Sequence, residues 1–154
     1  MNLSLSDELK AAFPNTSNGF QIKRPLVLDK TVTDPYGLSG FISGEGCFYV
    51  GLAKSATNKL QEGVQLEMQI TQHSRDELLI RSLRNFFGCG TVSAKRGTNV
   101  YRYRVSKFLD LTDKVIPFLN KYPILGVKSR DYDDFCHVVS IMKLKQHLTR
   151  EGLE

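Results

Sequence analysis

Residues 34–50 have the sequence DPYGLSGFISGEGCFYV, which marks a helix and the strand that follows it. Asp34 suits the N-cap of a helix, and Pro35 suits the first helical position, where its missing N–H is not needed. The helix then runs over Tyr36–Glu45, and Gly46 is typical of the residue that ends a helix. The next residues, 47–53, have the composition of a strand. We therefore expect a helix that passes directly into a strand.

Four further segments complete the expected fold. A second strand is predicted over Val64–Gln72, followed by a helix between His73 and Phe87 that starts with a Ser74/Glu77 capping box. A hairpin (91–95 and 100–107) follows, then helices over 109–121 with a break at Pro117, from Ser129 to about 145, and from Thr149. This order predicts an α+β fold, with an antiparallel sheet covered by helices on one face. We expect a linker-like arm over 1–33 and a single domain over 34–154.

Composition excludes several classes of protein. The chain has 154 residues, of which 41% are hydrophobic and 24% charged, as in an ordinary globular domain. No run of about 18 apolar residues is present, so no membrane span is predicted. The three cysteines form no CxxC pair, and the three histidines lack the spacing of ligand pairs, which argues against a zinc site or a disulfide framework.

The positive charge is concentrated in one segment. The formal net charge is +5, and residues 91–107 contain five basic residues and no acidic one. A surface that faces phosphates has this kind of local charge excess. The five are Lys95, Arg96, Arg102, Arg104 and Lys107.

Two of the predicted strands alternate strictly between apolar and polar residues. One face of each is apolar, and the other carries Gln, Glu, Thr, Arg and Ser. Arg suits guanine and Gln suits adenine in a major groove, but any half-exposed sheet also alternates, so solvent remains an alternative partner for this face. The base-reading candidates are Tyr49, Gln65, Glu67, Gln69, Thr71, Ser93, Lys95, Arg102, Arg104 and Ser106.

Small residues recur four apart in the helix 35–45: Ser39 with Ser43, and Gly40 with Gly44. Glycine inside a helix is about 1 kcal/mol less favourable than alanine, so two of them require a reason. Such a stripe allows close approach of a second helix across a two-fold axis, in a homodimer or pseudo-dimer. Tight packing of the helix on its own sheet is the alternative.

Glu45 lies in the last helical turn, where the helix dipole disfavours an acid by about 0.3–1 kcal/mol. A carboxylate beside unpaired helix carbonyl groups favours a cation, and Mg²⁺ is the natural choice. A single acid is a poor site, and we expect a second one to be brought alongside it.

The segment LSGFISGEG, residues 38–46, resembles the LAGLIDADG motif of homing endonucleases. ITQH (70–73), FFGCG (86–90) and LGVKSRDY (125–132) extend the resemblance in the same order. It implies a curved four-stranded antiparallel sheet covered by helices on one face, with the other face in the major groove of DNA.

The resemblance also implies roles for individual residues. Glu45 would be the metal-binding acid, joined by the carbonyl of Gly44, while Gln72 and Lys128 would line the catalytic pocket. Ser43 stands where many members have an acid of structural importance. The implied cofactor is Mg²⁺, for which Ca²⁺ or Mn²⁺ can substitute in binding.

The function implied is site-specific, metal-dependent hydrolysis of double-stranded DNA with a staggered cut, by a protein encoded in a mitochondrial intron. Members carry two motifs or dimerise, and this chain has one. We therefore expect it to pair with a second copy of itself or a complementary LAGLIDADG half. Residues 5–14 resemble the linker between halves, which suggests an isolated second half. An RNA-binding intron maturase, a DNA-binding half-domain without cleavage, and a basic domain with no nucleic-acid partner remain alternatives.

Overall fold

The computed structural model of the protein describes residues 7–12, 31–54, 62–149 and 151–152. The order of helices and strands is as predicted. In chain order the elements are α1 (Asp7–Ala12), α2 (Pro35–Glu45), β1 (Gly46–Lys54), β2 (Glu62–His73), the 3-10 turn η1 (Ser74–Asp76), α3 (Glu77–Phe87), β3 (Thr91–Ala94), β4 (Val100–Val105), α4 (Phe108–Asp110), the π-helical stretch η2 (Leu111–Val115), α5 (Ile116–Lys121), α6 (Lys128–Lys143) and the 3-10 turn η3 (Gln146–Leu148).

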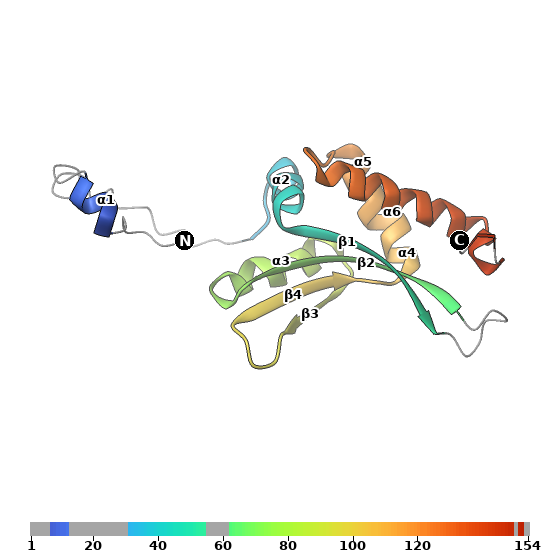
Figure 1. Ribbon diagram of the computed structural model, residues 1–154, viewed down its shortest axis with the longest axis horizontal. Coiled ribbons are helices and arrows are strands. Elements are labelled where there is room, and N and C mark those ends of the chain that lie inside the picture. Colours follow the sequence, from blue (N-terminus) through green and yellow to red (C-terminus); the bar gives the residue numbers. More distant parts are fainter. Residues whose placement is uncertain (1–6, 13–30, 55–61, 150, 153–154) are drawn as a thin grey trace.

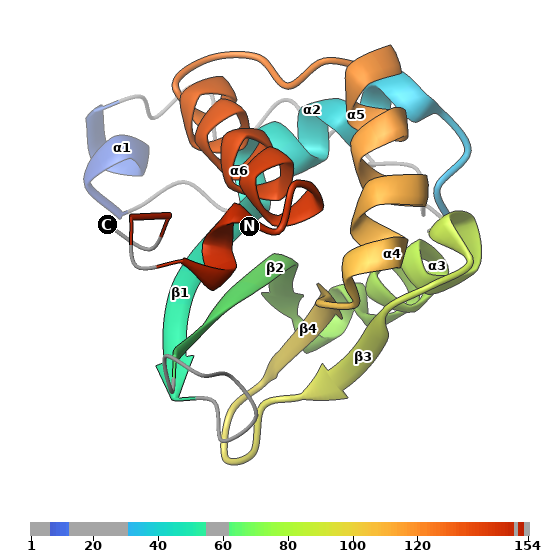
Figure 2. The same ribbon diagram turned by 90° about the vertical axis from the view of Figure 1, so that its right-hand side faces the viewer.

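The four strands form one antiparallel sheet in the order β1-β2-β4-β3. Helices α2 to α6 lie on one side of this sheet, as Figures 1 and 2 show. The other side, which we call the open face, is covered by no element of the described chain. The predicted α+β fold is therefore confirmed. Among the described residues, no helix has the length and apolar character needed to cross a bilayer.

The core lies between the sheet and the helices. From β2 the side chains of Leu66, Met68 and Ile70 are buried there, and from β4 those of Tyr103 and Val105. The ring of Phe48 in β1 packs on Tyr132 and Phe135 of α6, with ring centroids 5.2 and 5.4 Å apart. Because successive strand residues point to opposite faces, this burial assigns the polar residues between them to the open face.

Helix α2 begins as predicted. Asp34 accepts hydrogen bonds from the backbone N–H groups of Tyr36 (3.2 Å) and Gly37 (2.7 Å). At the other end Gly46 follows the helix with φ −71° and ψ 152°, an extended conformation that any residue can adopt. Glycine is needed for space instead: a Cβ atom there would lie 2.5 Å from the carbonyl oxygen of Ile42. The helix therefore passes into β1 without an intervening loop.

The predicted capping box of α3 does not form. Ser74 lies in η1, and the α-helix starts at Glu77, whose carboxylate accepts a 2.6 Å hydrogen bond from Arg81. That bond lowers the pKa of Glu77. The 3-10 turn moves the helix start three residues along, so Glu77 is at the wrong position to reach back to Ser74.

Three predicted helix boundaries also differ. Pro117 does not break its helix, because the π-helical turn η2 directly before α5 makes room for the ring, and α4, η2 and α5 continue as one column (Figure 2). Ser129 lies inside the first turn of α6, where its hydroxyl donates to the carbonyl of Gly126. Thr149 is extended and ends η3.

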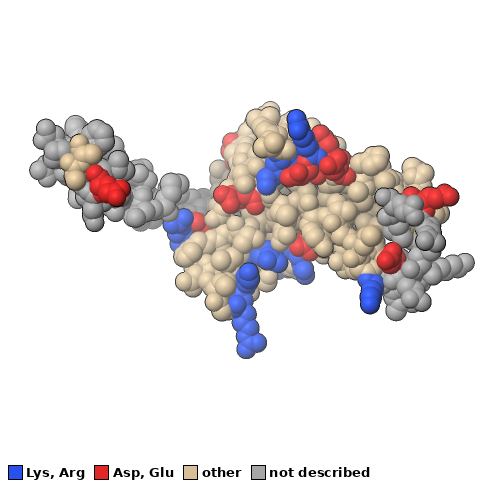
Figure 3. Space-filling view, in the orientation of Figure 1, with Lys and Arg blue, Asp and Glu red and all other residues tan. Residues whose placement is uncertain are grey.

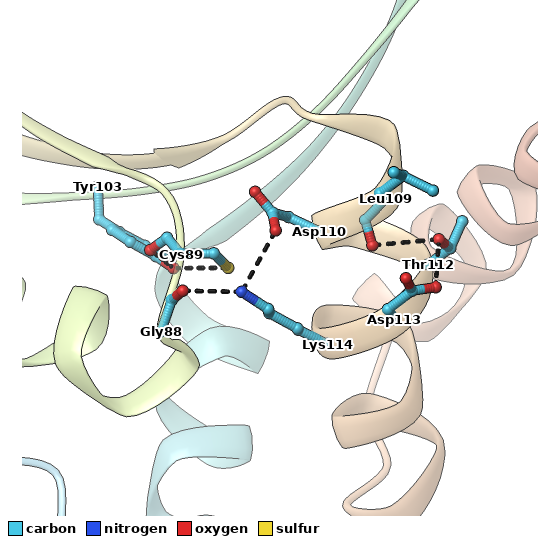
Figure 4. Close-up of polar contacts among 8 residues, drawn as sticks. All are labelled: Gly88, Cys89, Tyr103, Leu109, Asp110, Thr112, Asp113 and Lys114. Atoms are coloured by element: carbon cyan, nitrogen blue, oxygen red, sulfur yellow. Dashed lines mark hydrogen bonds and ion pairs between the residues drawn. The ribbon is translucent and has the colours of Figure 1, made fainter.

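The FFGCG segment, residues 86–90, joins α3 to the sheet (Figure 4). Gly88 ends α3 with φ +60°, and its carbonyl accepts a 2.8 Å hydrogen bond from Lys114. Gly90 has φ +80°, and a Cβ there would lie 2.6 Å from the ring of Tyr103. The Tyr103 hydroxyl donates to the carbonyl of Cys89, and burial raises the pKa of both side chains. These residues are structural.

Candidate functional site

Glu45 is the last residue of α2, and its side chain is exposed. Lys128, the first residue of α6, donates from Nζ to the carbonyl oxygen of Gly46 at 2.5 Å. The ammonium group of Lys128 is therefore held at Gly46, the residue after Glu45, although α6 begins 83 positions after Glu45 in the chain. The fold brings these two predicted site residues to the same junction.

Gln72 comes from the third element of this junction. Gly46 pairs with Ile70, so Gln72 lies two residues further along β2, beyond the point where α2 becomes β1. It is half-buried. Since Ile70 faces the helices, Gln72 has the same orientation, toward the side on which α2 ends. The three predicted catalytic residues thus come from α2, β2 and α6.

The donors at the end of α2 suit a hard divalent cation. Glu45 offers a carboxylate, and Gly44 offers a backbone carbonyl oxygen. Within the described residues, no group of three or more His, Cys, Asp or Glu side chains is placed to hold a metal ion.

The small residues of α2 divide into two pairs. Ser39 is 4% exposed, and its hydroxyl lies 2.9 and 2.8 Å from the carbonyl oxygens of Tyr122 and Pro123. Ser43 donates to the carbonyl of Ser39 and accepts from the N–H of Leu125. Both hydroxyls are therefore used inside the chain. A place for the serines in an interface with a second helix stays a prediction, and their hydroxyls would not be the groups that form it.

Gly40 and Gly44 are exposed. A Cβ atom built on either glycine meets no atom within 4 Å in the described part of the chain. Packing within the described part of the chain therefore does not require glycine at either position. Of the four predicted interface residues, these two keep an outward orientation that a second helix could approach.

The base-reading candidates on the strands occupy the open face. The register places Gln69 opposite Arg104 and Thr71 opposite Arg102, while Glu67 lies opposite Tyr49 of β1. Gln65, Ser93 and Ser106 share this face by alternation from these pairs. Lys95, Arg96 and Lys107 are exposed where β3 and β4 end.

Cys47 and Thr91 are two of the open-face residues that the sequence prediction missed. Cys47 pairs with Gln69, whose amide nitrogen lies 3.7 Å from its Sγ, and Thr91 pairs with Arg104. The alternation that selects Tyr49 and Ser93 also selects these two residues, and it is the signal that would have found them.

The charges are distributed unequally between the two sides. Figure 3 shows Lys and Arg side chains projecting from the lower, sheet side of the molecule, whereas many acidic side chains gather near the helices, where basic ones also occur. On the open face, Arg104 Nη1 lies 3.5 Å from a carboxylate oxygen of Glu67. A polyanion would be attracted to the sheet side.

Comparisons with known proteins match this arrangement. The model of the LAGLIDADG endonuclease family matches residues 38–139. A Neurospora crassa protein named probable intron-encoded endonuclease 3 is 38% identical over 154 residues, which cover 99% of this chain and 28% of that protein.

Two solved structures of I-SmaMI, a LAGLIDADG homing endonuclease, are similar to this chain over 99% of its length. One is bound to cleaved DNA and the other to an uncleaved DNA target in the presence of calcium ions. Each has a TM-score of 0.83 and 42% sequence identity, over 50% and 51% of the I-SmaMI chain. This chain thus spans about half of that protein and less than a third of the Neurospora protein.

Proposed function

Because the chain belongs to the LAGLIDADG endonuclease family, we propose that it acts as one half of a site-specific endonuclease for double-stranded DNA. The observation that carries this proposal is the junction of α2, β1 and α6. There Lys128 bonds to Gly46, the residue after the exposed Glu45, at one end of a sheet with a polar, basic open face. The DNA-bound I-SmaMI structures support it.

We assign Mg²⁺ as the cofactor, with Glu45 and the carbonyl of Gly44 as this chain's ligands. A divalent cation bound there would polarise a phosphate oxygen and stabilise charge on the leaving oxygen. The calcium ions named for one I-SmaMI complex support a site for a divalent cation.

Lys128 and Gln72 would stabilise and orient the reacting groups at this site. The Lys128 ammonium, fixed by the Gly46 carbonyl, presents positive charge where the negative charge of a phosphodiester would increase during hydrolysis. Gln72 can donate and accept hydrogen bonds, so it can orient water or the phosphate. Lys128 would stabilise the charge on the phosphate and Gln72 would orient water or the phosphate, while Glu45 would hold the metal.

The second half is a copy of this chain or a complementary LAGLIDADG half, packed on the Gly40 and Gly44 stripe of α2. Two such helices side by side would bring two Glu45-type acids together at the axis. Each half would cut one strand, which gives a staggered break. Encoding in an intron is supported by the name of the Neurospora relative. The mitochondrion as its location stays a prediction from the family.

Selection of cleaved and of bound sites from a random DNA library, with Mg²⁺ or with EDTA, tests the proposal. Glu45→Gln should lower cleavage by about 100-fold or more, because even residues outside the first ligand shell contribute 10- to 100-fold. Affinity for DNA should stay within about threefold. Asp134→Asn, an exposed carboxylate of α6, makes the same change in net charge and should leave both unchanged.

The alternatives give different results. Binding of DNA without cutting would identify a binding half-domain, and preference for structured RNA would identify a maturase. Loss of DNA affinity in Glu45→Gln would refute the metal-binding assignment. Absence of nucleic-acid binding at any salt concentration would leave a basic domain with another function.

A further inference from the structure

Glu67 is a carboxylate on the face that carries the basic residues. It lies in β2, between Gln65 and Gln69 on the open face, and its side chain is only 18% exposed. It lines a hollow of about 420 Å³ at the edge where β4 ends, together with Tyr49, Gln65 and Arg104. A carboxylate on a surface that approaches phosphates is repelled by them, so its position there needs a reason.

Arg104 supplies part of that reason. Its guanidinium Nη1 lies 3.5 Å from a Glu67 oxygen, while its side chain remains 49% exposed. The two residues are diagonal neighbours, since Arg104 pairs with Gln69 and Glu67 precedes Gln69 by two positions. Because the pair is electrically neutral as a unit, it adds little to general attraction for a polyanion, and its value must lie in specific contacts.

Arg102 provides the internal comparison. It lies two residues earlier in β4, opposite Thr71 and Ser93, whose side chains carry no charge. Within the described residues, its Nε is buried and has no hydrogen-bond partner. The two arginines of β4 therefore have different electrostatic environments. Arg104 has the carboxylate of Glu67 beside it, and Arg102 has hydroxyl groups.

We propose that Glu67 and Arg104 together read one G·C base pair of the target. This rests on the proposed function, and it goes further by assigning a base pair to a pair of side chains. Arg104 donates to O6 and N7 of guanine, and Glu67 accepts from the N4 amine of the paired cytosine. A G·C pair presents these two acceptors and this donor side by side in the major groove.

An A·T pair does not match the same side chains. It presents an amine donor where the guanidinium also offers donors, and it places the O4 acceptor of thymine, flanked by the methyl group, where the carboxylate requires an amine. Glu67 also restrains the Arg104 guanidinium, which reduces the conformational entropy cost of binding. The ion pair thus favours one base pair and disfavours the others.

The test compares sequence preferences of the full chain at each position of sites selected from a random DNA library for binding. Glu67→Gln keeps shape but removes the charge, and Arg104→Lys keeps the charge but removes the planar fork. Both variants should relax discrimination by about tenfold at the same G·C position. Glu67→Gln should at the same time bind non-specific DNA more tightly, which a merely damaged fold would not do.

Two matched controls define the outcome. Arg102→Lys should relax a different position, and Asp134→Asn should change none. Unchanged preferences in Glu67→Gln, or relaxation at a position that Arg104→Lys does not affect, would overturn this inference while the proposed function stands. If the unmodified chain selects no DNA sequence, the proposed function fails and this inference with it.

Discussion

Gly46 follows Glu45 and packs closely against the last turn of α2. Its backbone is extended, so its importance comes from the close approach of Ile42, whose carbonyl oxygen and Cγ2 would lie 2.5 and 2.8 Å from an added Cβ. Gly46→Ala should therefore lower the free energy of unfolding by about 1–3 kcal/mol, as overpacking does. Denaturant titration measures this.

Gly44→Ala is the matched control for that prediction. Its Cβ would meet open space, and alanine favours the helix by up to about 1 kcal/mol, so this variant should be as stable or more stable. Equal effects of the two substitutions would contradict the close-contact explanation.

We expect Lys128 to act through its hydrogen bond to Gly46, the residue after Glu45. Lys128→Met keeps the length of the side chain and removes the ammonium that donates to Gly46. We expect cleavage to slow by about 10- to 100-fold, with DNA affinity nearly unchanged. Single-turnover cleavage and equilibrium binding separate the two effects. Lys143→Met, in the last turn of α6, should change neither, and a parallel loss of binding in Lys128→Met would refute the positioning role.

The sequence correctly predicted which residues share one face of a strand or helix. It did not predict which other segments contact that face. Alternation in β2 and β4 placed Glu67, Gln69 and Arg104 on the open side, because strand periodicity is fixed by the backbone. Helical spacing grouped Ser39 with Ser43, also correctly. It could not show that the carbonyl groups of residues 122 and 123 accept from Ser39, since that contact joins segments 83 and 84 positions apart.

At the scale of elements, α2 has two sides with different partners. Leu38 and Ile42 are buried in the core, while Gly40 and Gly44 face outward. Gly40→Leu should fold at least as well as the parent chain, since leucine is a good helix former and the site is open. Pairing with a second helix should be abolished, because the leucine prevents close approach.

Sedimentation of the chain with and without target DNA measures that pairing, and thermal unfolding monitors the fold. Thr149→Leu, a substitution at an exposed residue outside α2, is the control for added apolar surface. Unchanged association of Gly40→Leu would exclude this stripe as the interface.

Predicted element boundaries failed where two local preferences compete. Ser74 and Glu77 have capping-box spacing, but a 3-10 turn and the Glu77–Arg81 hydrogen bond are formed instead. Pro117 normally interrupts a helix, but the π-helical turn of η2 accommodates it. Rules based on neighbouring residues do not separate the competing local structures clearly in free energy. The choice at Pro117 also depends on the burial of Leu111 and Val115 in the core, which the local sequence does not reveal.

At the scale of the whole molecule, the unequal distribution of charge between the sheet side and the helical side predicts how affinity for DNA depends on salt concentration. Lys95 and Arg96 are exposed in the turn that joins β3 to β4. Removal of one side chain that binds a phosphate should reduce the slope of log affinity against log salt by about 1, whatever the DNA sequence.

Lys95→Ala combined with Arg96→Ala should therefore flatten that slope by up to about 2 and weaken specific and non-specific DNA alike. Lys143→Ala removes one positive charge from the helical side and should leave the slope unchanged.

Arg104 provides the sharper comparison, because Glu67 already offsets its charge. Arg104→Ala should alter base preference while changing the slope less than the hairpin variant. Equal slopes for the hairpin variant and Lys143→Ala would show that DNA does not approach from the open face.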